Sequence, residues 1–167
     1  HYTVWINPDG TPDFKVMHEP RRQECFAKNY CHLCGKKMQP PYALIGGPLC
    51  VEYQRFVDGP MHPDCAMYAA RVCPFLSTPT GRYRAVVPVL EELEHGVVIE
   101  TLPEVSSVRP KRMAFCLVDH YEVRRNPARK NEHGGPHAAN PGGSNQLTVR
   151  VQSFLSVDWD VMPKSSE

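Results

Sequence analysis

Two pairs of side chains place the strongest constraint on how this chain can fold. Cys31 and Cys34 are separated by two residues, and His62 and Cys65 have the same separation further along the chain. Such a gap lets one tight turn, or one face of a helix, present both side chains to a single ion. Gly35 follows the first pair, where this kind of turn often needs a residue free to take positive φ. Thiolate and imidazole ligands form the closed tetrahedron of structural zinc sites, so these four residues are the predicted zinc ligands.

The second pair is predicted to lie at the start of a helix. Pro63 suits the first helical turn, where backbone N–H groups have no partner within the helix. Residues 66–73 are rich in helix formers, and Pro74 is expected to end the helix. On such a helix His62 and Cys65 lie on one face, as a shared metal ion requires.

The residues between the two pairs predict a β-hairpin, with strands at 42–45 and 49–56 joined by a Gly-Gly-Pro turn. A knuckle, a hairpin and a helix carrying two ligands in its first turn resemble the treble-clef zinc finger group over residues 31–74. Treble clefs occur in nucleases, ribosomal proteins, ubiquitin machinery and lipid binders. The resemblance therefore implies a fold and a metal but no single activity. Residues 60–76 also resemble bacterial or phage zinc-binding proteins of unassigned activity.

The cysteines leave other interpretations open. The count is seven, so disulfide pairing throughout would leave one thiol over. Free cysteines are also often buried as small hydrophobic residues, which is the preferred interpretation of Cys25 over its use as a fifth ligand. Metal binding is favoured for the two pairs because packing alone does not explain their spacing. Reduced cysteines in a metal pattern favour a cytoplasmic protein.

The other local patterns predict short elements, in agreement with a content of 17 prolines. Residues 2–17 predict a hairpin around a turn at 7–10, because Pro and Gly occupy turn positions there. Residues 20–30 predict a short helix. In it, the basic residues Arg21, Arg22 and Lys28 are expected to face outward, and Cys25 and Phe26 inward.

The second half of the chain predicts a small, mainly antiparallel sheet. Strands are expected at 82–89, 97–102, 113–123 and 147–161, with one helical turn at 89–94 and a long Gly, Pro and His loop at 131–146. The predicted fold class is therefore α+β. A treble-clef half at 1–80 is joined to a β-rich half at 81–167, either as two units or as one compact domain.

The charge pattern gives a second candidate surface. The net charge of +1 points to neither nucleic acid nor membrane, and no apolar run reaches the roughly 18 residues of a spanning helix. No signal peptide is visible, although the chain begins at His1, so an upstream segment is left open. The basic residues of the second half could contact phosphate. The preferred interpretation is that they pair with the acidic stretch at 91–104 or stay solvated. These basic residues are Arg109, Lys111, Arg112, Arg124, Arg125, Arg129 and Lys130.

Two classes of function fit these observations. Asp119 and His120, followed by Gly134, Gly135 and Asn145, are similar to the order of HNH nucleases, which implies His120 as a general base within 119–147. However, no His follows Asn145, a strand is predicted where that family has a helix, and the zinc ligands are complete upstream. Other enzyme motifs are absent. The preferred function is therefore a binding module with a structural, non-catalytic zinc. Its partner, protein or nucleic acid, and its oligomeric state stay open.

Overall fold

Helices and antiparallel strands together make up the described part of this chain, as the predicted α+β class requires. The computed structural model describes residues 2–77, 110, 112–125 and 147–159. The helices are α1 (Glu19–Lys28), α2 (Pro48–Glu52), α3 (Pro63–Val72) and α4 (Pro74–Ser77). The strands are β1 (Val4–Ile6), β2 (Pro12–Met17), β3 (Tyr42–Gly46), β4 (Arg55–Phe56), β5 (Ala114–Val118), β6 (Glu122–Arg125), β7 (Leu147–Arg150) and β8 (Ser156–Asp158). Over these ranges, no helix combines the length and apolar character needed to cross a membrane.

The N-terminal hairpin and the first helix confirm the predictions from local sequence. Strands β1 and β2 pair antiparallel, and the Asn7 N–H donates to the Thr11 carbonyl at 2.8 Å to close the turn. Gly10 takes φ +85° in this turn, which suits a residue without a side chain. Helix α1 starts after His18, whose Nδ1 accepts from the Arg21 N–H, and it ends at Asn29 in a left-handed conformation. Polar caps therefore define both ends of α1.

One side chain of α1 points the opposite way from the prediction. Cys25 is buried and Lys28 exposed, as expected, but Arg22 is only 2% exposed. Its guanidinium donates to the Val57 carbonyl at 2.9 Å and forms an ion pair with Glu19 at 3.3 Å. A buried arginine needs such partners. The expectation of an outward Arg22 was wrong because a distant carbonyl supplies one of them.

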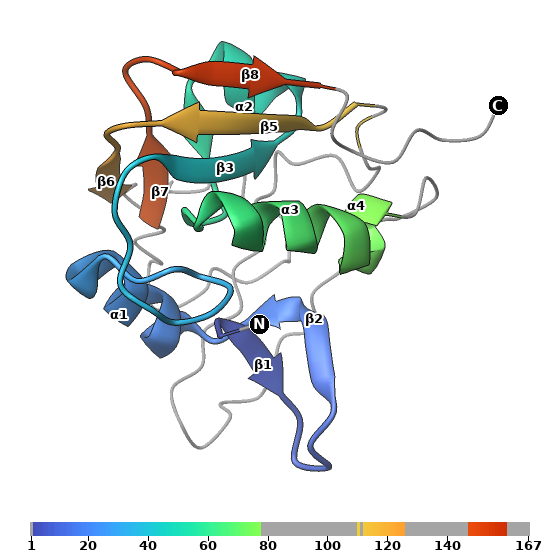
Figure 1. The fold of residues 1–167 in the computed structure, drawn as a ribbon. Coiled ribbons are helices and arrows are strands. Elements are labelled where there is room, and N and C mark those ends of the chain that lie inside the picture. Colours follow the sequence, from blue (N-terminus) through green and yellow to red (C-terminus); the bar gives the residue numbers. More distant parts are fainter. Residues whose placement is uncertain (1, 78–109, 111, 126–146, 160–167) are drawn as a thin grey trace, which may run out of the picture.

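Two three-stranded antiparallel sheets form the centre of the structure, with strand orders β3-β5-β8 and β4-β7-β6. In the first sheet, β3 and β5 pair from Tyr42 opposite Val118 to Gly46 opposite Ala114. Figure 1 shows helix α3 alongside β3, with α2 behind the same sheet. Strand β5 is therefore central, with a strand on each edge.

The β3-β5-β8 sheet buries side chains on both faces. One face packs against the alanines of α3 in a cluster that includes Ala43, Ile45, Ala66, Ala69, Ala70 and Phe115. The other face packs against the second sheet in a cluster made of Leu44, Phe56, Ala114, Cys116, Val118, Val149 and Val151. A strand buried on both faces is apolar throughout rather than alternating, which explains the uninterrupted apolar run of β5.

The hairpin predicted between the two ligand pairs is not formed as expected. Residues 48–52 form helix α2 instead of a strand, and β4 pairs with β7 rather than with β3. Gly47 precedes the helix and Pro48 occupies its first turn, where proline is favoured. The Gly-Gly-Pro stretch therefore starts a helix, while β5 supplies the partner of β3.

Each of the two long predicted strands is divided between sheets. The segment 113–123 forms β5 and β6, separated by a turn at Asp119 and His120, so His120 is not a strand residue. The segment 147–161 forms β7 in one sheet and β8 in the other. The strands expected at 82–89 and 97–102, the helical turn at 89–94 and the loop at 131–146 lie outside the described residues.

Candidate metal centre

The first two predicted ligands lie in a tight turn at the end of α1. The Cys31 N–H donates to the Lys36 carbonyl, and the Gly35 N–H donates back to the Cys31 carbonyl, each at 2.8 Å. Gly35 has φ +72°, and a Cβ there would lie 2.7 Å from Cδ2 of Tyr2. Glycine is therefore required both by the backbone conformation and by the close approach of the Tyr2 ring.

The other two ligands lie at the start of α3. His62 is the N-cap residue, and Cys65 follows in the first helical turn after Pro63. Just before the helix, Met61 forms two backbone hydrogen bonds with Ala43 of β3, of 2.8 and 2.9 Å. This bridge anchors the helix start to the sheet, so the positions of His62 and Cys65 are set by the core.

The structure brings all four predicted ligands together. The ligand atoms of Cys31, Cys34, His62 and Cys65 lie within 4.8 Å of one another, and within the described residues this is the one group of its kind. Nδ1 of His62 lies 3.5 Å from Sγ of Cys34 and 3.8 Å from Sγ of Cys65. Tetrahedral zinc with ordinary bond lengths separates such atoms by about 3.6 Å. The group could therefore hold a metal ion, and its donors are those that zinc prefers.

A contact outside the ligand set orients the imidazole of His62. Its Nε2 lies 3.1 Å from the backbone carbonyl oxygen of Lys37. A carbonyl can only accept, so this contact places the ring proton on Nε2 and leaves the Nδ1 lone pair facing the three sulfurs. Metal-binding histidines commonly have their second nitrogen held in this way.

The electrostatics of the sulfurs also suit a cation. Burial and the nearby Cys31 sulfur raise the pKa of Cys65 to about 12. Burial opposes ionisation of Cys34 as well, but the Lys36 N–H and the neighbouring thiols together lower its pKa. Three thiolates this close repel one another, and a divalent ion would supply the compensating charge.

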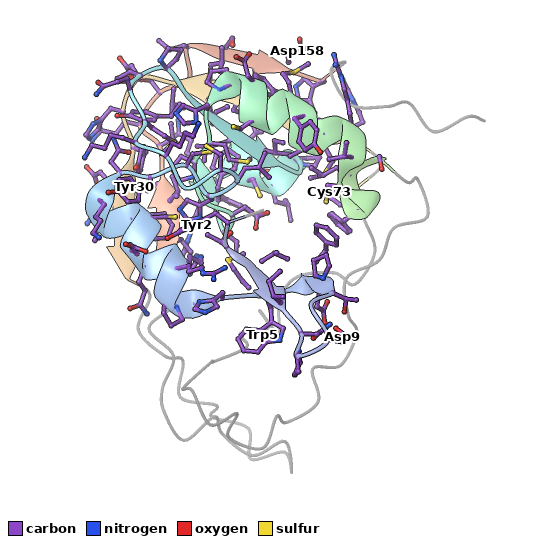
Figure 2. All side chains as sticks on the ribbon, turned by 60° about the horizontal axis from the view of Figure 1, so that its bottom comes forward. Tyr2, Trp5, Asp9, Tyr30, Cys73 and Asp158 are labelled. Atoms are coloured by element: carbon purple, nitrogen blue, oxygen red, sulfur yellow. The ribbon has the colours of Figure 1, made fainter. Side chains whose placement is uncertain are left out.

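The ligand group lies at the edge of the core. Cys31 is fully buried and belongs to the cluster beneath α3, whereas Cys34 is exposed and His62 and Cys65 are half-buried. Figure 2 shows Tyr2 of the hairpin segment next to α1, and its ring contacts the ligand-bearing turn at Gly35. An ion at this position would link the turn to α3, and the Tyr2 ring packs the hairpin segment against the same turn.

The remaining cysteines do not join this group. All seven are free thiols. Cys25 is fully buried, and burial together with the Cys31 and Glu24 charges raises its pKa to about 11. It is a packed thiol, as preferred from the sequence. Cys73 caps the C-terminal end of α3, where Figure 2 labels it.

His32 was not considered from the sequence, although it stands between two ligands. It is 3% exposed, and within the described residues neither of its ring nitrogens has a hydrogen-bond partner. Its ring lies 4.6 Å from that of Phe26 and directly against Gly59, where a Cβ would come within 2.0 Å of Cε1. Burial, reinforced by the charge of Arg22, lowers the pKa of His32 to about 3, so this ring is a neutral packing group.

The predicted basic surface is only partly within the described residues. Arg112 is exposed, with its guanidinium 5.0 Å from the ring centre of Trp159, and Arg124 pairs with Glu122. Arg125 contributes backbone to β6. The others, Arg109, Lys111, Arg129 and Lys130, lie outside the description. Contact between these seven residues and nucleic acid stays a prediction.

The nuclease alternative also stays a prediction. His120 is exposed in the turn between β5 and β6, and Asp119 beside it is exposed too. The glycines at 134–135 and Asn145, which completed the similarity, lie outside the described residues.

Comparison with known proteins identified no relative of this chain. No protein-family model, curated protein or solved structure matches this chain. The treble-clef resemblance therefore has no family match behind it, and the function must be argued from the site.

Proposed function

We propose that this chain is a zinc-stabilised binding module, in which the ion holds the fold together and another surface engages a protein or nucleic-acid partner. The observation that carries this proposal is the group of four protein ligands within 4.8 Å of one another. A catalytic zinc keeps one position open for water or substrate. Here the chain itself supplies four donors, so the ion would contribute folding energy rather than chemistry.

The treble-clef arrangement is part of this proposal. The elements follow one another along the chain as they do in treble clefs: a ligand-bearing turn, a bridge between Ala43 and Met61, and helix α3 with two ligands at its start. The departure is α2, which stands where the second hairpin strand was expected. The bridge between Ala43 and Met61 still holds together the two ends of the segment that contains α2. The ligand geometry therefore does not depend on the missing hairpin strand.

Zinc would act here by closing a long loop. The two ligand pairs are far apart in the sequence, and linking residues 31 and 65 removes much of the freedom of the unfolded chain between them. By analogy with a cross-link closing about 35 residues, this amounts to about 4 kcal/mol. A cluster of three cysteines and a histidine in a metal-binding pattern favours a reducing compartment such as the cytoplasm.

The test is the metal content of protein purified under reducing conditions. We expect about one zinc per chain in the unchanged protein. Cys34→Ser removes an exposed ligand and should abolish stoichiometric zinc, because three remaining donors leave the tetrahedron open. Cys73→Ser is the matched control, since Cys73 lies outside the ligand group and should keep its zinc. Equal zinc content in the two variants would overturn the proposed site.

A further inference from the structure

An open cavity of about 300 Å³, with none of the four metal ligands in its lining, forms where three parts of the chain meet. Its lining comes from the end of α1, the first residue of β3, and the segment that joins β5 to β6 together with β6 itself. The lining residues are Phe26, Asn29, Tyr42, His120, Tyr121 and Val123. In Figure 1, α1, β6 and the beginning of β3 lie on the same side of the molecule. A volume at the small end of ligand pockets suits one ring system rather than a large ligand.

Hydrogen bonds hold the cavity in shape. The Tyr121 hydroxyl donates to Oδ1 of Asn29 at 2.7 Å, and Nδ2 of Asn29 donates to the Tyr42 hydroxyl at 3.1 Å. The same amide nitrogen also contacts the Met38 carbonyl at 3.4 Å. The two tyrosine rings pack edge to face, with centroids 5.0 Å apart. The aromatic walls and the central amide are therefore arranged before any ligand arrives.

This network leaves specific polar groups available to a ligand. The Tyr42 hydroxyl accepts from Asn29, and within the described residues its own proton has no acceptor. Oδ1 of Asn29 accepts one hydrogen bond and has a second lone pair. The exposed imidazole of His120 adds a donor and an acceptor at the rim. As far as the described part of the chain shows, the cavity thus presents aromatic walls together with at least one free donor and one free acceptor.

The chemistry of the lining argues against a phosphate or an alkylammonium ion as the group that enters the cavity. None of the six residues is a carboxylate, lysine or arginine. Burial, with smaller effects of Tyr42 and Cys25, raises the pKa of Tyr121 to about 12, so this hydroxyl stays neutral. A phosphate would need cationic partners. An alkylammonium ion would be attracted to the tyrosine rings, but it has no acceptor to offer the proton of the Tyr42 hydroxyl. The inserted group should therefore be neutral, flat, and able both to donate and to accept along one edge.

We propose that this cavity binds a single unpaired nucleobase. Any of the bases can stack on aromatic side chains. The donor and the acceptor of the cavity match the hydrogen-bonding edge of an unpaired base. A tyrosine hydroxyl also donates and accepts, but at a single atom, whereas a base places its donors and acceptors on adjacent atoms of one edge and can meet Tyr42 and Asn29 together. This inference rests on the proposed binding function and narrows its partner to nucleotides or single-stranded nucleic acid.

The experiment titrates zinc-loaded protein with nucleosides, nucleoside monophosphates, ten-residue single-stranded DNA and RNA, and the amide of N-acetyltyrosine. Binding is followed by NMR shifts of the Asn29 side-chain amide and the Val123 backbone amide. We expect saturable shifts with the base-containing ligands. Free nucleosides binding as well as oligonucleotides would indicate a small-molecule site, and tighter binding of oligonucleotides would indicate a strand-binding site; both support a base in the cavity.

Two variants make the assignment specific. Tyr42→Phe keeps the ring and removes the hydroxyl, and should weaken base binding roughly three- to tenfold. His120→Ala removes an exposed rim residue and should also weaken it. Tyr68→Phe, at an exposed tyrosine of α3, is the matched control and should bind like the unchanged protein. Binding that ignores Tyr42→Phe and His120→Ala, absence of base binding at millimolar concentration, or binding of the tyrosine amide alone would overturn the proposal.

Zinc content is measured on every sample. Loss of base binding with zinc retained refutes the cavity assignment only, whereas a chain without zinc refutes the proposed function itself.

Discussion

Replacing Gly35 by alanine tests the turn that carries Cys31 and Cys34. At φ +72° an alanine is strained by about 1–2 kcal/mol. Its Cβ would also lie 2.7 Å from the Tyr2 ring, so the ring must move, at a further cost of about 1–3 kcal/mol for overpacking. We therefore expect Gly35→Ala to lower the free energy of unfolding by about 2–5 kcal/mol.

Gly10→Ala separates the two contributions. Gly10 also has positive φ, at +85°, but apart from its chain neighbours no atom of the described residues lies within 4 Å of the position where its Cβ would be built. This variant should lose only the conformational part, about 1–2 kcal/mol. The measurement is urea unfolding of the zinc-loaded protein, followed by circular dichroism. Truncating the ring in Tyr2→Ala should make Gly35→Ala less costly than it is alone, which a double-mutant cycle detects.

The same change should weaken zinc binding. The Gly35 N–H donates to the Cys31 carbonyl, so a shift of this turn moves Sγ of Cys34 away from Nδ1 of His62. Part of the strain in the Gly35→Ala turn is relieved when zinc dissociates, and each 1.4 kcal/mol relieved in this way weakens the affinity for zinc tenfold. Competition with a chromophoric chelator measures this effect. If Gly35→Ala matches Gly10→Ala in both unfolding and zinc affinity, the geometry assigned to the turn is wrong.

Four other perturbations have clear expected outcomes. Chelation by EDTA should lower the melting temperature, and Zn²⁺ but not Mg²⁺ should restore it, because sulfur ligands do not suit magnesium; recovery with Mg²⁺ would contradict the ligand set. Apparent zinc affinity, measured by competition at several pH values, should rise with pH, because the Cys65 thiol, with a pKa of about 12 without metal, must release its proton on binding; a flat profile would argue against thiolate ligands. Gly59→Ala should lower the free energy of unfolding in urea by about 1–3 kcal/mol or more, because a Cβ there overlaps the His32 ring. Phe56→Ala, at a fully buried ring, should cost about 3–5 kcal/mol in the same assay, while the exposed Leu155→Ala should change little.

Local signals account for the parts of this protein that sequence reasoning predicted well. The hairpin of β1 and β2, helix α1 and helix α3 each carry their own turn residues, caps or terminating prolines. The two ligand pairs were also predictable from local signals. Within each pair, a spacing of two residues in one turn brings the two side chains together whatever the rest of the chain does.

Pairing between strands that are distant in the sequence was beyond the reach of sequence reasoning. A short apolar segment can pair with any suitable edge, and the partner of β3 proved to be β5 rather than the adjacent segment. Likewise, the apolar residues at 113–123 and 147–161 do not reveal where the chain leaves one sheet for the other. Long-range packing decides these points, and a period of two in the sequence is compatible with either outcome.

The sequence by itself determined that two thiol and imidazole pairs exist, that each sits on a turn able to aim it, and that zinc is the ion such donors prefer. Only the tertiary structure decided that the pairs meet, through the bridge of Ala43 with Met61. It alone turned Arg22 inward and assembled Asn29, Tyr42 and Tyr121 around one cavity. The physical reason is range: caps and spacings act over a few residues, whereas burial and hydrogen-bond partners depend on segments that fold against each other from far apart.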